Sequence, residues 1–197
     1  MDAFLLLAAF PPELAGLGDA PPQGWRVGLT GAGAIAAAAT TARLLAEDKP
    51  SKVLFVGTCG AYRTDLDIGG CVAVSEAVAT SVPEIRRRAY RPGIEATRWS
   101  AGWDLPLPRH SLAAPPAITT DPDDAALLAG VAGVENLEVA GVFAACAAAC
   151  VPAAAALVVA NRVGPNAHGE WAANHEGASG KLVDTLMALG VFADPGL

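Results

Sequence analysis

The chain has 197 residues, a length that predicts one domain with a sizeable buried core. Its formal net charge of −7 disfavours a general nucleic-acid binder or a protein of anionic membrane surfaces, because both need a basic surface. Hydrophobic residues make up 53% of the sequence, yet no run of about 20 apolar residues has membrane-spanning character.

The N-terminal segment and the cysteines both predict a cytoplasmic protein. The chain begins with an acidic Asp2 and no basic residue, and two prolines end its first apolar run too early for a secretory signal peptide. Cysteines stay free thiols in the cytoplasm, and we expect structural roles for all four: Cys59, Cys71, Cys146 and Cys150. No histidine or second cysteine pair matches the spacing of Cys146 and Cys150, so no metal or cofactor is predicted.

Apolar strands alternate with helices along the first 80 residues. Buried strands are indicated by β-branched and aromatic runs bounded by turn residues, at Phe4–Ala9, Trp25–Thr30, Lys52–Gly57 and Val72–Thr80. Pro11 and Pro12 open a short helix, since proline is tolerated in a first helical turn. An alanine-rich helix is predicted from Ala34 to about Glu47.

The pattern breaks between Val82 and Pro116, where prolines, arginines and two tryptophans predict a long irregular stretch without a helix. A structureless loop of that length is unusual in a compact domain, so it is either functional or contains an unrecognised strand pair. We interpret the arginine cluster at 86–88 as a solvated turn or helix end.

Regular elements return in the last third of the chain. Asp121 is a typical N-cap for a helix that runs to Ala129. A short strand ending near Leu137, a helix over 140–149, a strand at Ala153–Ala160 and a helix from about Glu170 to Leu189 follow. This alternation predicts an α/β fold with a layered, partly parallel sheet, in a single domain over residues 1–197.

Polar or glycine-rich groups follow the predicted strands. Ligands bind at the carboxyl ends of strands in open α/β sheets, so these groups are expected to converge: Glu13, Gly31-Ala32-Gly33, Thr58-Cys59-Gly60, Leu137-Glu138 and Asn161. Burying an unpaired carboxylate beside an almost wholly apolar helix costs free energy. We therefore expect Glu138 either to cap that helix or to bind a ligand. A carboxylate can hold both hydroxyls of a ribose while an amide such as Asn161 reads a base, which predicts a nucleoside site.

The glycines at 31 and 33 allow another interpretation. The segment Gly31–Ala36 matches the dinucleotide-binding fingerprint with alanine in the third glycine position. That site also needs an acidic residue after the next strand, where the sequence reads Gly57-Thr58-Cys59. We therefore interpret the glycines as a tight strand–helix turn rather than a dehydrogenase motif.

Five segments carry a family resemblance: Ala8–Glu13, Val56–Tyr62, Leu66–Gly70, Val134–Glu138, and Val159–Gly164 with Trp171. Together they resemble the purine nucleoside phosphorylase and nucleosidase superfamily, and within it the futalosine hydrolases of menaquinone biosynthesis. The resemblance covers most of the chain except residues near 82–116. It implies a three-layer α/β/α fold around a mixed sheet, no cofactor or metal, and a homodimer or larger assembly.

The resemblance also implies roles for individual residues. Glu13 would position or deprotonate the attacking water, and Asn161 would contact the purine as the second catalytic residue. Glu138 would hold the ribose hydroxyls, with Leu137 packed against the sugar. The remaining expected substrate-binding residues are Thr58, Cys59, Gly60 and Asn136.

Two residues predict the substrate and the reaction. The amide of Asn161 can donate to N7 and O6 of a 6-oxopurine, whereas an aspartate would suit adenine. In phosphorylases that resemble this chain an arginine stands at the position of Phe55, so water is the expected acceptor here. The predicted reaction is the hydrolysis of futalosine to hypoxanthine and dehypoxanthinyl futalosine.

Two alternatives stay open. One is a methylthioadenosine/adenosylhomocysteine nucleosidase, which Asn161 disfavours. The other is a non-catalytic nucleoside-binding protein, indicated by Val139 in place of a small residue and by the predicted lack of a helix in 82–116. His168 and His175 flank Trp171 and are either ordinary surface histidines or parts of a lid.

Overall fold

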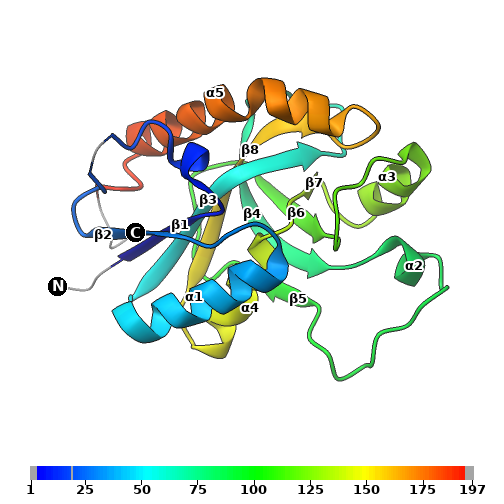
Figure 1. Ribbon diagram of the computed structural model, residues 1–197, viewed down its shortest axis with the longest axis horizontal. Coiled ribbons are helices and arrows are strands. Elements are labelled where there is room, and N and C mark those ends of the chain that lie inside the picture. The colour runs from blue at the N-terminus through cyan, green and yellow to red at the C-terminus, as the bar shows by residue number, and fades with distance from the viewer. Residues whose placement is uncertain (1–3, 19, 194–197) are drawn as a thin grey trace.

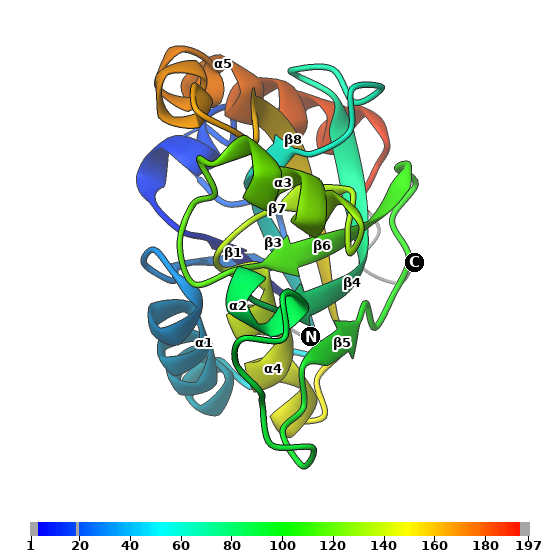
Figure 2. The same ribbon diagram turned by 90° about the vertical axis from the view of Figure 1, so that its right-hand side faces the viewer.

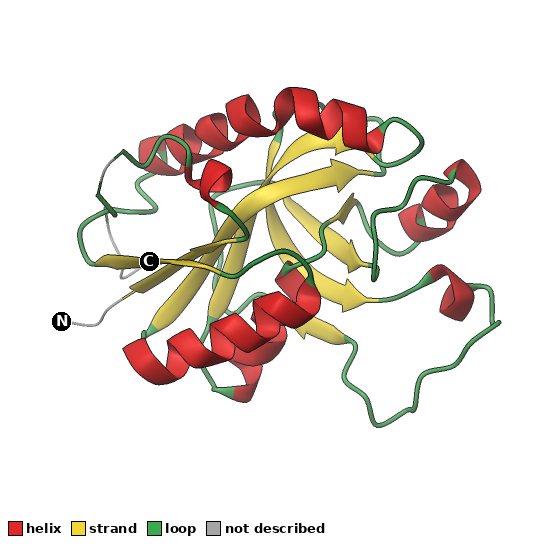
Figure 3. Ribbon diagram, viewed as in Figure 1, coloured by secondary structure: helices red, strands yellow, loops and turns green. Residues whose placement is uncertain are grey.

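The computed structural model describes residues 4–18 and 20–193, which form three layers with a mixed sheet in the middle (Figures 1 and 3). Eight strands build the sheet in this part of the chain: β1 (Phe4–Ala8), β2 (Trp25–Leu29), β3 (Lys52–Ala61), β4 (Cys71–Ala79), β5 (Arg98–Ser100), β6 (Arg109–Ala114), β7 (Val134–Glu135) and β8 (Ala153–Arg162). The helical elements are the 3₁₀ turn η1 (Pro11–Leu14), α1 (Ala34–Asp48), α2 (Val82–Ile85), α3 (Pro122–Ala129), α4 (Val139–Ala148) and α5 (Ala167–Ala188). The predicted α/β/α fold class is confirmed.

Part of the sheet closes on itself. β3 pairs in parallel with β8 and antiparallel with β7, and β4 pairs antiparallel with β8 and in parallel with β6. A parallel pairing of β6 with β7 completes the ring β3–β8–β4–β6–β7. β1 and β2 extend the sheet in parallel from β3, and β5 adds antiparallel to β4. Closure leaves few strand edges open within the ring, and it brings β3, β7 and β8 together where the candidate residues lie.

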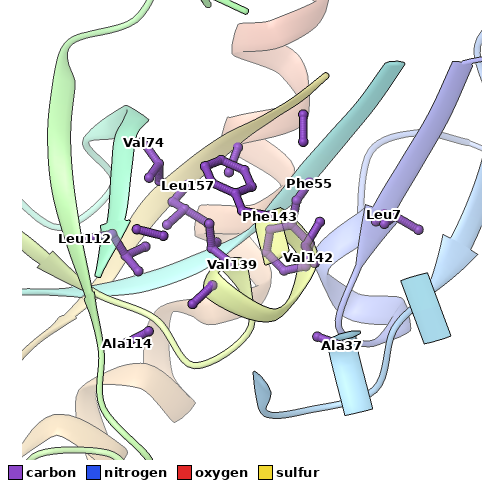
Figure 4. Packing of buried hydrophobic residues seen from close by; sticks show 14 of the residues in the cluster. Leu7, Ala37, Phe55, Val74, Leu112, Ala114, Val139, Val142, Phe143 and Leu157 are labelled. Carbon is purple, nitrogen blue, oxygen red and sulfur yellow. The ribbon is translucent and has the colours of Figure 1, made fainter. Parts of the chain in front are cut away.

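Alternate residues of the strands face the two helical layers, as the pleat of a strand requires. On β3, Val53 and Phe55 pack into the cluster beneath α1 and α4, which we call the α4-side cluster (Figure 4). Leu54 and Val56 face the opposite cluster beneath α5, which we call the α5-side cluster. Figures 1 and 2 show α5 over one face of the sheet and α1 with α4 over the other.

Two strands are longer than predicted, and this changes how the site is built. β3 continues through Gly57 to Ala61, and β8 continues through Ala160 to Arg162. Glycine and asparagine are read from sequence as strand ends, but the pairing of β3 with β8 continues past them. Thr58, Cys59, Gly60 and Asn161 therefore lie within paired strands rather than in loops after them.

The predicted lack of a helix in 82–116 is wrong, because α2 forms one helical turn at its start. The segment also contains two strands, β5 and β6, but they pair with β4 rather than with each other. Between α2 and β5 the chain extends away from the body (Figure 1), and the arginines at 86–88 are exposed there as predicted. The last helix begins at Ala167, three residues before the predicted Glu170. Within the described residues, no helix combines the length and the apolar character needed to cross a bilayer.

Candidate functional site

Glu13 lies in η1, directly after β1, and its side chain is buried with 2% exposure. Its two oxygens accept three hydrogen bonds from neutral donors. Oε2 accepts the backbone N–H of Ala9 at 2.9 Å. Oε1 accepts both the backbone N–H of Thr58 at 2.9 Å and the Thr58 hydroxyl at 3.1 Å. The prolines that open η1 thus place a carboxylate against the middle of β3.

Gly57 leaves the room that this carboxylate occupies. A Cβ atom at position 57 would lie 3.0 Å from Oε1 of Glu13 and 3.2 Å from Oε2, closer than side chains normally approach. Burial raises the pKa of Glu13 to about 7, backbone hydrogen bonds from Thr58 and Ala9 oppose the rise, and the charge of Glu138 adds to it. A carboxyl group with a pKa near neutrality can take up or release a proton at working pH.

Glu138 occupies the N-cap position of α4 but does not cap that helix with its side chain. The cap is Asn136, whose Oδ1 accepts the backbone N–H groups of Glu138 at 2.8 Å and Val139 at 2.9 Å. The amide of Asn136 also donates to the carbonyl of Thr58 at 3.0 Å, which ties this turn to β3. The interpretation of Glu138 as a helix cap is therefore wrong.

The carboxylate of Glu138 instead reaches the start of α1, where Oε1 accepts the backbone N–H of Gly33 at 2.8 Å. α1 and α4 approach closely enough that a Cβ on Gly141 would lie 2.2 Å from the carbonyl oxygen of Ala34. Burial raises the pKa of Glu138, and the hydrogen bond from Gly33 partly opposes the rise. The glycines at 31 and 33 have φ of 77° and 86°, so they form the tight turn predicted from sequence.

Asn161 is buried near the end of β8, opposite Gly60 of β3. The register of the two strands shifts between Cys59 and Gly60, and such a bulge re-aims the side chains beyond it. A Cβ on Gly60 would lie 3.0 Å from the Nδ2 atom of Asn161, so this glycine makes space for the amide. One N–H of the Asn161 amide donates to the carbonyl of Arg162 at 2.9 Å, and the amide has a second N–H for another acceptor.

An aromatic group on α5 joins this cluster. The indole N–H of Trp171 donates to the Thr58 hydroxyl oxygen at 3.2 Å. The ring of Trp171 stacks on His175 with centroids 4.2 Å apart and lies 5.9 Å from the ring of Phe10. His168 also stacks on Trp171, with centroids 6.2 Å apart, but it is exposed, whereas His175 is half-buried.

Hydrogen bonds thus link Glu13, Thr58 and Asn136 into one cluster, and Glu138 lies close enough to influence Glu13 by charge. One predicted substrate-binding residue is placed differently. The Cys59 thiol points into the α4-side cluster, and its burial raises its pKa, so only the backbone of Cys59 faces the site. Leu137 is half-buried beside Glu138.

Sequence reasoning missed Glu135, a second buried carboxylate in the same turn. It accepts the backbone N–H of Thr119 at 3.0 Å, the Thr119 hydroxyl at 2.7 Å and the hydroxyl of Tyr62. These bonds join β7 to the segment before α3 and to the end of β3. The carboxylate of Glu135 therefore has its hydrogen-bond donors within the protein. Across residues 4–18 and 20–193, no three His, Cys, Asp or Glu side chains gather as a metal site.

Residues 25–189 match the sequence profile of the phosphorylase superfamily. The chain belongs to this superfamily. No curated protein matches its sequence. This membership confirms the resemblance found in the sequence.

Solved structures share the fold of this superfamily member across nearly their whole length. Two come from Helicobacter pylori: a 5′-methylthioadenosine/S-adenosylhomocysteine nucleosidase with butyl-thio-DADMe-Immucillin-A, and a native futalosine hydrolase. Each has a TM-score of 0.83 and is 15% identical in sequence. The match to the nucleosidase covers 96% of this chain and the match to the futalosine hydrolase covers 95%, and each match covers 97% of the solved chain. A third, a 5′-methylthioadenosine/S-adenosylhomocysteine nucleosidase from Colwellia psychrerythraea with adenine, has a TM-score of 0.79 at 16% identity, covering 98% of this chain and 95% of its own. At these identities the likeness concerns the fold alone.

Proposed function

We propose that this phosphorylase-superfamily protein hydrolyses the N-glycosidic bond of a purine nucleoside. The observation that carries the proposal is the pair of buried carboxylates, Glu13 and Glu138, held by neutral donors at one place. Glycosidic cleavage develops positive charge on the ribose, and uncompensated carboxylates stabilise that charge. A pKa near 7 also allows Glu13 to accept a proton from an attacking water.

We assign the two carboxylates different roles. Glu138 would hold the ribose hydroxyls, with Leu137 against the sugar, and Glu13 would orient and deprotonate the water. Backbone groups of Thr58, Cys59 and Gly60 would line the sugar, while Asn136 holds the turn that carries Glu138. The comparison with solved nucleosidases supports this assignment through the shared fold.

We further propose that the base is a 6-oxopurine and that the substrate is futalosine. The Asn161 amide has a free N–H beyond its bond to Arg162, and this donor suits N7 or O6 of hypoxanthine. A donor amide facing the 6-amino group of adenine would be unpaired, which costs binding in a desolvated site. This argument favours futalosine over methylthioadenosine as substrate.

Water is favoured over phosphate as the acceptor. Phe55 is fully buried in the α4-side cluster at the position where similar phosphorylases carry an arginine. None of the ion pairs between described residues includes Glu13 or Glu138. A phosphate dianion beside two carboxylates would meet like charge without a cationic partner.

The test measures release of hypoxanthine and adenine from futalosine, its 6-amino analogue, inosine and methylthioadenosine, with and without phosphate. We expect hypoxanthine from futalosine in phosphate-free buffer. Glu13→Gln and Glu138→Gln should each lower kcat by about 10²–10⁴-fold, whereas the surface variant Glu95→Gln should retain wild-type kcat. Adenine release instead would reject the 6-oxopurine assignment, and a phosphate requirement would reject hydrolysis.

A non-catalytic nucleoside-binding protein is the main rival from another class. Its motivations were the bulk of Val139 and the predicted lack of a helix in 82–116. The Val139 side chain is fully buried in the α4-side cluster (Figure 4), and α2 lies at the start of that segment. Tight binding of nucleosides without release of any base, unchanged in Glu13→Gln, would favour this rival. We also propose a homodimer or larger assembly, which sedimentation of the purified protein would test.

A further inference from the structure

We propose that Trp171 and Thr58 form a directional hydrogen-bond relay that keeps the Thr58 hydroxyl donating to Glu13, which makes both of them positioning residues for that carboxylate. The relay runs from the indole N–H of Trp171 to Oγ1 of Thr58 at 3.2 Å, and from that hydroxyl to Oε1 of Glu13 at 3.1 Å. It connects α5, β3 and η1 through three side chains. Its catalytic consequence rests on the function proposed above.

The chemistry of the indole fixes the direction of the first hydrogen bond in the relay. An indole N–H can only donate, whereas a hydroxyl can donate or accept. Because Trp171 donates to Thr58, the Thr58 oxygen accepts there, and its own hydrogen is free to point at Glu13. Glu13 then receives three donors, counting the backbone N–H groups of Thr58 and Ala9. Three donors favour the ionised carboxylate over the protonated acid.

Without the indole, this preference is lost. A freed Thr58 hydroxyl can rotate and accept a hydrogen bond from protonated Glu13 as readily as it donates one to the carboxylate. Burial already favours the protonated form of Glu13 and raises its pKa to about 7. Trp171 therefore opposes protonation of Glu13 without touching it.

The aromatic stack keeps the indole in place. Trp171 stacks on His175 with an interplanar angle of 16°, and the His175 Nδ1 atom lies 3.1 Å from the carbonyl oxygen of Trp171. Phe10, which directly precedes η1, packs against both rings at 5.9 Å and 6.3 Å.

Other titratable groups near Glu13 can change its pKa, and the test must distinguish their effects from that of the relay. Glu138, at the start of α4, is the charged group that acts on Glu13, whereas His175 of α5 contacts Phe10 and Trp171. The Cys59 thiol of β3 points into the α4-side cluster, and Ala9, which follows β1, contributes its backbone N–H. Glu138 acts by charge, and the Cys59 thiol is neutral because burial raises its pKa. The test variants leave all of these groups in place.

The test compares Trp171→Phe, which keeps an aromatic ring but lacks the N–H, with Thr58→Val, which keeps the shape but lacks the hydroxyl. Thr58→Ser retains the hydroxyl and serves as the rescue variant. Trp103→Phe is the matched control, because its indole donates to the carbonyl of Val53 outside this cluster. The readout is the titration of the Glu13 carboxyl carbon by ¹³C NMR in the ligand-free protein, assigned with Glu13→Gln.

We expect the pKa of Glu13 to rise by roughly one unit in Trp171→Phe and Thr58→Val, and to stay at the wild-type value in Thr58→Ser and Trp103→Phe. The acidic limb of the kcat/KM profile should move by the same amount, because Glu13 must be ionised to accept a proton. An unchanged Glu13 pKa in folded Trp171→Phe and Thr58→Val would overturn the relay. A shifted pKa in a protein that releases no base from any nucleoside would support the relay and overturn the proposed function.

Discussion

Two buried carboxylates and three surface carboxylates of this protein have opposite kinds of hydrogen-bond partner. We call Glu13 and Glu138 the inner carboxylates, and Glu76, Glu84 and Asp104 the outer carboxylates. The inner pair bonds to backbone N–H groups and a hydroxyl. Each outer carboxylate pairs with an arginine at 2.6–2.7 Å, on the side of the molecule that carries β4, β5 and β6.

The difference appears in their acidity. Burial raises the pKa of Glu13 to about 7, while hydrogen bonds from Arg91 and Ser81 lower the pKa of Glu84 to about 2. An arginine beside Glu13 would lower its pKa and cancel the negative charge that a ribose cation needs. Keeping buried carboxylates without a cation costs stability, and such local costs are expected at functional sites.

The largest expected effect comes from the close approach of α4 to α1, which holds Glu138 on the N–H of Gly33. In Gly141→Ala the new Cβ would lie 2.2 Å from the carbonyl oxygen of Ala34, and backbone cannot yield as a side chain can. We expect the free energy of unfolding to fall by about 3–4 kcal/mol, measured by urea denaturation. The displaced Glu138 should become hydrated, and its pKa should fall toward that of a solvated glutamate, because burial is the main cause of its rise.

Gly177→Ala is the control for this substitution. Gly177 also lies in a helix, α5, but a Cβ there meets nothing within 4 Å. That variant should be about 0.5–1 kcal/mol more stable than wild type, because alanine is the better helix former. Wild-type stability in Gly141→Ala would contradict the close helix contact.

Local patterns were enough to predict the strands outside 82–116, but not β5, β6 or the contacts between elements. The alternation in Lys52–Gly57 predicts a strand whose residues face two cores, and β3 has this arrangement. What the pattern missed was its continuation, since Gly57 and Gly60 are read as strand ends. Because neither glycine has a side chain, Gly57 leaves space for the Glu13 carboxylate and Gly60 leaves space for the Asn161 amide.

The partners of the site residues are distant in sequence, and no periodicity reports them. Glu138 bonds to Gly33 across 105 positions, and Trp171 bonds to Thr58 across 113. A buried carboxylate must find donors somewhere, so sequence reasoning could predict that Glu138 has a partner but not which one. Of the two roles left open for Glu138, the helix cap is wrong, because Asn136 accepts the N–H groups at the start of α4 and the Glu138 carboxylate bonds to Gly33 instead.

A second prediction concerns how stability depends on pH. The pKa of Glu13 is about 7 in the folded protein against 4.5 for an ordinary glutamate, so the folded state holds more protons than the unfolded chain between these values. The contribution of Glu13 to the free energy of unfolding is therefore fully present below about pH 4.5 and is lost as the pH rises through about 7. Its size is roughly 3 kcal/mol.

Urea denaturation of wild type and Glu13→Gln at several pH values measures this contribution. The stability of Glu13→Gln relative to wild type should rise between about pH 4.5 and 8, because the glutamine does not ionise. The outer variant Glu76→Gln should show no such rise. A pH-independent difference between wild type and Glu13→Gln would mean that Glu13 titrates like an exposed carboxylate.

The third prediction tests the contact between Glu13 and β3. In Gly57→Ala the added methyl group would push on both carboxylate oxygens and move them by a few tenths of an ångström. Misplacement on this scale should lower kcat/KM for the nucleoside, measured by release of its purine, by about 10–100-fold. This loss corresponds to a barrier increase of about 1.4–2.7 kcal/mol. Gly177→Ala should keep the wild-type kcat/KM. Full activity in Gly57→Ala would show that the reaction does not depend on the position of the Glu13 carboxylate against β3.

The smallest expected effect is at the outer carboxylates. Arg91 pairs with Glu84 at 2.7 Å and with Glu95 at 3.0 Å, closing the segment between α2 and β5. Because these side chains are partly exposed, Arg91→Gln should lower the free energy of unfolding by at most about 1 kcal/mol. The pKa of Glu84 should rise toward its ordinary value, while kcat/KM stays that of wild type.

The effect of Arg91→Gln should also shrink in high salt, because salt screens an exposed pair. A larger loss, or a loss of activity, would mean that the segment held by Arg91 supports the inner carboxylates, and the separation between the two sets would then fail.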